Sequence, residues 1–169
     1  MAVMPTSQLV LRALVLLGPV VALLATGPAG HWPPWWVLVP VIGLAGAFAA
    51  TPDSPVGAGV SLVVLAWWTI SLGDEIQPEA MVAAAGLLVA HLAAQVASYG
   101  PAAMPVSGAT LRLWGLRTTP LLLTIPATWA VARLLRGEPE PSGIWILGVA
   151  AALAATVAAT VALGDHREA

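Results

Sequence analysis

The chain has 169 residues, of which 59% are apolar and only 8% are charged, and its formal net charge is −2. Soluble domains carry roughly a quarter charged residues, so a water-soluble fold would lack the charges to cover its surface. The net charge also gives no basic surface for nucleic acid. Because the chain has no cysteine, disulfides, thiolate metal sites and cysteine nucleophiles are excluded.

Six apolar stretches are long enough to cross a membrane as helices, which takes about 20 residues, with a range of roughly 17 to 25. Turns that contain proline or glycine separate most of them, as expected at helix ends. The predicted spans are residues 9–26, 33–50, 56–72, 79–99, 117–135 and 144–163. The sequence therefore predicts an all-α integral membrane bundle of about six helices, which forms a single transmembrane domain over residues 1–169.

The first stretch also resembles a signal peptide. Arg12 precedes an apolar run at 13–24, which is followed by small residues. Cleavage after that run would leave five spans. We favour a retained helix, because Pro19 interrupts the run and the cleavage-site pattern is poor.

The connection at residues 101–116 is longer than the other turns and contains an amphipathic piece at 111–114, which we expect to lie along the membrane interface. The fifth span follows, with Pro120 and Pro126 inside it. The turns after the second and fifth spans are both rich in proline and acidic residues. These turns would correspond in a three-plus-three inverted arrangement.

Short cytoplasmic loops collect arginine and lysine, and this rule gives the orientation. Four arginines share one side with both termini, namely Arg12, Arg112, Arg117 and Arg167. Arg133 and Arg136 lie on the other side. Both termini are therefore predicted to be cytoplasmic. Tryptophan prefers the headgroup level, and seven of the eight tryptophans fall in the outer parts of the spans, with Trp114 alone near the inner face.

Helices in lipid associate through small residues and interhelical hydrogen bonds, and two spans carry such residues every four positions. The stripe on the fourth span contains Gly86, Ala90 and Ala94, and the stripe on the sixth contains Gly148, Ala152, Thr156 and Thr160. We expect the fourth, fifth and sixth helices to form the tightest part of the bundle.

Polar side chains within the predicted spans are the candidates for function, because their burial in lipid costs free energy. His91 and Gln95 lie one turn apart in the fourth span, and Thr124 and Thr128 lie one turn apart in the fifth. His91 could relay a proton or bind a ligand. The alternative, which we favour, is a structural hydrogen bond between helices, worth about 1 kcal/mol.

We predict no metal and no cofactor. The three histidines are far apart in sequence, and only His91 lies well inside a span, so a bis-histidine haem site is disfavoured.

Asp53 or Ser54 is expected to cap the third helix. Arg112 and Arg117 flank Trp114 in a pattern that suits anionic lipid headgroups.

The spans are rich in alanine and valine, lysine is absent, and the stretch 91–101 leads towards the amphipathic piece at 111–114. In these features the chain resembles small multi-span membrane proteins of actinobacteria. The resemblance implies a bacterial plasma membrane and no particular chemistry.

We expect a non-enzymatic accessory or scaffold subunit of a plasma-membrane assembly, because the loops are too short to hold a soluble domain. Its partners would be the lipid bilayer and other membrane proteins or further copies of the chain. The alternative is a small transporter or channel around His91 and Gln95. An intramembrane enzyme ranks last, since no second reactive group is evident beside His91.

Overall fold

The computed structural model describes residues 4–73, 76–101 and 103–136, together with the single positions 146, 150, 153 and 154. Contacts divide the chain into two units, Met1–Leu134 and Leu135–Ala169. In the second unit the described positions from 146 onward are helical. Apart from these four positions, the predicted sixth span lies outside the described residues, and so does its stripe of Gly148, Ala152, Thr156 and Thr160.

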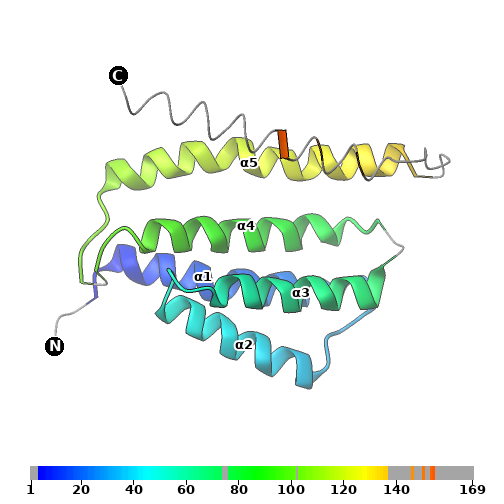
Figure 1. Ribbon diagram of the computed structural model, residues 1–169, viewed down its shortest axis with the longest axis horizontal. Helices are drawn as coiled ribbons and strands as arrows, with labels where there is room; N and C mark the ends of the chain where they lie inside the picture. Colours follow the sequence, from blue (N-terminus) through cyan, green and yellow to red (C-terminus); the bar gives the residue numbers. More distant parts are fainter. Residues whose placement is uncertain are drawn as a thin grey trace. The chain divides into compact units, whose positions relative to one another are not determined.

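The first unit is all-α, with no strand among its described residues. Its helices are α1 Thr6–Leu24, α2 Trp35–Ala50, α3 Val56–Leu72, α4 Glu79–Ala97 and α5 Gly108–Leu134 (Figure 1). A proline precedes each of the first four helices as N-cap, namely Pro5, Pro34, Pro55 and Pro78. Proline suits a helix start because its fixed φ matches the helix and it brings no orphan amide. The prediction that Asp53 or Ser54 caps α3 is wrong, because Pro55 is the N-cap and no side chain bonds there.

Among the described residues, two helices are long and apolar enough to span a membrane, α1 and α4, with 19 residues each. Helices α2 and α3 are apolar but shorter, at 16 and 17 residues. A core helix of a soluble protein and an N-terminal signal sequence satisfy the same criteria of length and composition. The six-span bundle is therefore not confirmed among the described residues.

Helix α5 is longer than the predicted fifth span. It starts at Gly108, so the expected interfacial piece at 111–114 is its first turns and not a separate segment. The Ser107 side chain explains this start, because its Oγ accepts a hydrogen bond from the Thr110 amide at 3.1 Å, as an N-cap serine does. The helix continues through Pro120 and Pro126.

Helix α1 is the centre of the first unit: it packs most extensively against α4 and also contacts α2 and α3. A Cβ added at Gly86 would lie 2.8 Å from the Gly18 carbonyl oxygen, so the two backbones are in direct contact. Ala90 and Ala94 are buried on α4. Helix α5 packs against α4 and buries none of its described side chains. The expected tight contact of α4 with α5 is therefore wrong for the described residues, because the close crossing of α4 is with α1.

Side chains from neighbouring helices bind carbonyl groups at the ends of α1 and α2. The Trp68 indole donates to the Ala22 carbonyl at 2.9 Å. Arg12 Nη1 donates to the carbonyls of Ala49 and Ala50 at 2.5 and 2.9 Å. The last carbonyls of a helix have no partner within the helix, so these bonds satisfy groups that would otherwise be costly to bury.

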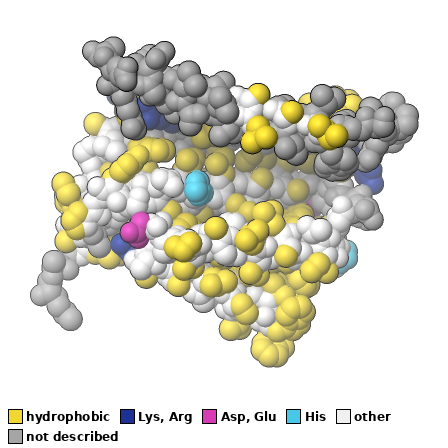
Figure 2. Space-filling view, viewed as in Figure 1, with side chains coloured by type: hydrophobic (Ala, Val, Ile, Leu, Met, Phe, Trp, Pro, Cys, Tyr) yellow, Lys and Arg dark blue, Asp and Glu magenta, His cyan; other side chains and the backbone are white. Residues whose placement is uncertain are grey.

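Tryptophans gather at one end of the first unit, because consecutive helices run in opposite directions (Figure 1). That end holds Trp32, Trp35, Trp36, Trp67, Trp68 and Trp129. Trp114, near the start of α5, lies towards the opposite end and contacts Tyr99 at a ring-centroid distance of 5.9 Å. Hydrophobic side chains are spread over the face drawn in Figure 2, which shows few charged groups.

Candidate functional site

The predicted polar residues line two different pockets of the first unit. A pocket of about 370 Å³ lies between α4 and the turn that joins α2 to α3. Helix α4 contributes His91, Gln95 and Ser98, and the turn contributes Asp53 and Ser54. We call it the His91 pocket. It combines a carboxylate, an imidazole, an amide and two hydroxyl groups.

The His91 pocket opens near one end of the helices and not at their middle. A helix rises 1.5 Å per residue, so His91 lies about 9 Å from Ala97, the last residue of α4. The α2–α3 turn lies at this same end because the helices alternate in direction. The His91, Gln95 and Asp53 side chains are exposed.

The side chains of Asp53, His91 and Gln95 form no hydrogen bond or ion pair within the described part of the chain, whereas the Ser98 hydroxyl donates to the Gln95 carbonyl at 2.8 Å. A catalytic base must come within hydrogen-bond reach of the group it serves, at roughly 2.6–3.2 Å. Asp53 and His91 line the same pocket, and no hydrogen bond joins their side chains in the described part of the chain. No group of three histidine or carboxylate side chains that could hold a metal occurs in the residues described.

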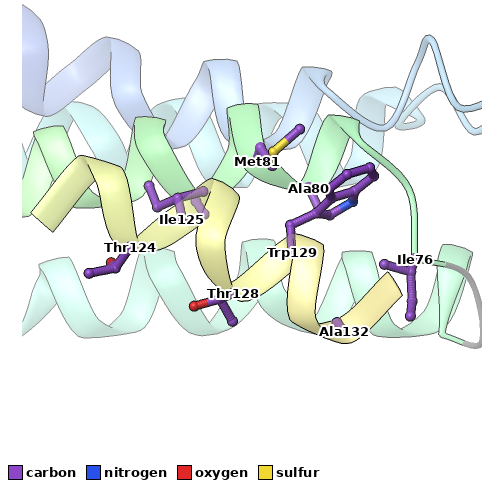
Figure 3. A pocket seen from close by; sticks show the side chains of 9 residues that line it. Ile76, Ala80, Met81, Thr124, Ile125, Thr128, Trp129 and Ala132 are labelled. Atoms are coloured by element: carbon purple, nitrogen blue, oxygen red, sulfur yellow. The ribbon is translucent and has the colours of Figure 1, made fainter. Parts of the chain in front are cut away.

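Thr124 and Thr128 line a separate pocket of about 360 Å³ between α4 and α5 (Figure 3). Its other lining residues, such as Met81 and Trp129, are largely apolar. The Thr124 hydroxyl donates to the Leu121 carbonyl of its own helix at 2.7 Å. The structure thus places the two threonines apart from His91 and Gln95, so the four candidates do not form one site.

The remaining predicted residues have other positions. Gly86 contacts Gly18 of α1, and Ala90 lies beside the same glycine. Arg112 and Arg117 are exposed on the first half of α5. Neither arginine has a hydrogen bond to another described residue.

The contribution of the α2–α3 turn to this pocket was not predicted, because Asp53 was expected to cap a helix. The turn and the end of α4 must nevertheless meet at one end of an alternating bundle. The alternation of helix directions was the signal that could have placed Asp53 near Gln95 and Ser98.

Comparison of the chain with protein-family models, curated proteins and solved structures finds no match. Function is therefore inferred from the residues themselves and from their geometry.

Proposed function

We propose that this chain is a multi-span membrane protein with six spanning segments and cytoplasmic termini, and that it is a non-enzymatic accessory or scaffold subunit of a plasma-membrane assembly. The apolar exterior of the helices supports insertion in lipid. Large apolar side chains such as Leu17, Leu62 and Ile70 are 51%, 67% and 79% exposed. A soluble monomer rarely exposes extensive apolar surface of this kind.

The observation that carries the assignment to an assembly is the exposed polar strip of α4. His91 and Gln95 are one turn apart on the helix surface and have no side-chain hydrogen bond from the described residues. A polar side chain in a membrane helix is costly unless it has a partner. A helix of another subunit could supply that partner, because polar groups bond across helices in membrane assemblies.

The short connections favour a subunit role over an enzyme. The described helices are joined by residues 25–34, 51–55, 73–78 and 98–107. None of these segments is long enough to form a soluble domain. Within the described residues, no pair of reactive groups is held in catalytic geometry.

The proposal predicts that the protein copurifies with membrane-protein partners through the α4 strip. The wild-type chain and a His91→Leu/Gln95→Leu variant would be extracted from native membranes in mild detergent and compared by mass spectrometry. We expect a stoichiometric partner with the wild-type chain and a loss of about tenfold or more with the variant, since one or two buried hydrogen bonds correspond to roughly 1–2 kcal/mol.

Thr69→Val provides the control, because Thr69 is exposed on α3 and its hydroxyl donates to the Leu65 carbonyl of the same helix. It should retain the partner. Recovery of the wild-type chain as a stable monomer, or equal partner recovery with the double variant, would contradict the proposal.

The second candidate is a small transporter or channel, and the composition of the His91 pocket favours it. Asp53, His91 and Gln95 could together bind a polar solute or pass a proton. We expect His91→Leu and Asp53→Asn to abolish flux in proteoliposomes and Thr128→Val to leave it unchanged, because Thr128 lines the other pocket. Flux equal to that of empty liposomes, across ions and small solutes, would exclude this candidate.

A further inference from the structure

Helix α4 borders an apolar groove on the side away from the His91 pocket. The groove lies between α1 and α4 and has a volume of about 490 Å³. Leu14, Leu17 and Val21 line it from α1, and Ala85 and Val89 are among the α4 residues that line it. We call it the α1–α4 groove.

The groove continues towards α5. A second hollow of about 260 Å³ lies between α1, α4 and α5, and it shares Leu14 and Val89 with the first. From Leu11 to Val21 the two hollows follow eleven residues of α1, which is about 15 Å of helix. The result is an elongated surface groove that runs along the helices.

The lining of the groove offers almost no free polar group. Its hydroxyl groups belong to Thr118 and Thr119, which donate to the carbonyls of Trp114 and Gly115 in their own helix at 2.7 and 3.1 Å. A polar ligand would therefore find few partners here. A hydrocarbon chain fits this lining, because its burial needs only apolar contact.

A positive charge lies beside the end of the groove nearest the start of α5. Gly115 and Thr119 line the groove, and Arg112 precedes them on α5 by three and seven residues. These spacings place Arg112 on the same side of the helix as the two lining residues. Arg117 has one groove-lining residue at such a spacing, Trp114 three residues before it, whereas Leu113 and Leu121, four residues away on either side, do not line the groove. The described acidic residue at this end, Asp53, lies in the His91 pocket on the other side of α4.

We propose that the α1–α4 groove holds one acyl chain of an anionic phospholipid, with the phosphate bound by Arg112. Arginine binds phosphate through a planar fork of donors. The Trp114–Tyr99 pair lies at the same end, where aromatic rings favour the headgroup level. The inference rests on the membrane insertion in the proposed function and not on any protein partner.

The test is retention of lipid by the purified full-length protein. The protein would be reconstituted in vesicles of equal parts phosphatidylglycerol and phosphatidylcholine, extracted in mild detergent and examined by native mass spectrometry. We expect one retained lipid, with phosphatidylglycerol preferred. Arg112→Gln should lower that preference about fivefold, the effect of roughly one cation at an anionic lipid surface, and Arg117→Gln should lower it less.

Two neighbouring alanines give a matched pair for the acyl chain. Ala85 lines the groove, whereas Ala84 lines the pocket on the Thr128 side. Ala85→Phe should fill the groove and eliminate the retained lipid, and Ala84→Phe should retain it. Circular dichroism and size-exclusion chromatography would show that both variants fold.

Several outcomes would overturn the lipid site. The first is equal retention of the two lipids by the wild-type chain, and the second is equal lipid retention by both phenylalanine variants. The third is a dimer that Ala85→Phe dissociates and Ala84→Phe does not, because the groove would then be occupied by a second copy of the chain. Failure of the proposed membrane insertion can be distinguished from failure of the lipid site. A chain that does not insert would not float with vesicles, whichever variant is tested. Loss of copurifying proteins would leave the lipid result unchanged.

Discussion

Replacement of Gly86 by alanine is expected to lower the free energy of unfolding by about 2–3 kcal/mol, and replacement by leucine is expected to prevent folding of the first unit. The added Cβ would lie 2.8 Å from the Gly18 carbonyl oxygen and 3.6 Å from the Ala22 amide nitrogen. These are backbone atoms of the central helix, so no side-chain rotation can relieve the clash. The α1–α4 crossing would have to separate along its length.

The converse substitution, Gly18→Ala, should have an equal or larger effect. Its Cβ would lie 2.6 Å from the Ala90 Cβ and closer still to the Gly86 carbonyl oxygen. The measurement is thermal or denaturant unfolding of the purified protein in detergent, followed by circular dichroism.

Gly43→Ala is the control for this series. Gly43 lies within α2, is exposed, and has no atom within 4 Å of an added Cβ. Alanine there should be neutral or stabilise by roughly 0.5–1 kcal/mol through helix propensity. Equal stability of Gly86→Ala and Gly43→Ala would show that α1 and α4 do not cross at this point.

Arg12→Gln is expected to destabilise the protein by about 2 kcal/mol, which is the usual contribution of a hydrogen bond to a charged group. The side chain extends from α1 to the Ala49 and Ala50 carbonyls at the end of α2. Its positive charge also faces the negative end of the helix dipole. Glutamine is shorter and neutral, so it would leave at least one of these carbonyls without a donor.

Lysine at the same position separates the two contributions of Arg12. Arg12→Lys keeps the charge but cannot present the planar guanidinium fork, so we expect a smaller loss than with glutamine. Arg117→Gln removes an exposed arginine that has no hydrogen bond to the described residues, and it should leave unfolding unchanged. If Arg12→Gln unfolded at the same temperature as Arg117→Gln, the bridge between α1 and α2 would contribute nothing to stability.

The all-α class could be predicted from the sequence because local features determine it. Apolar runs between prolines fix where helices form, as in α3, which occupies Val56–Leu72 directly after Pro55. The continuous α5 was missed, although Ser107 carried a capping signal three residues before Thr110. Pro120 and Pro126 lie inside the predicted fifth span as they do inside α5, so the prediction was wrong about where the helix starts and not about the prolines.

Which helices pack against each other was harder to predict from the sequence, because the pairing depends on which small residues of different helices come into contact. The stripe on α4 indicated a close contact, but we expected it with the fifth and sixth helices, whereas the structure has it with α1. Gly18 gave no such signal, since it stands beside Pro19 in a run of large apolar residues. The His91 pocket was hidden for a similar reason, because Asp53 and His91 are distant in sequence and are brought together only by helix direction.

The uneven placement of the indole rings has a consequence for how the protein would sit in a bilayer. Six of the described tryptophans lie at one end, together with Arg133 and Arg136, whereas the other end carries the exposed Arg112 and Arg117 and a single described tryptophan, Trp114. Indoles hold a fixed depth, while long arginine side chains can extend to reach the headgroups. When membrane thickness changes, the end with six tryptophans should keep its depth, and the adjustment should fall on the leaflet at the Arg112 and Arg117 end.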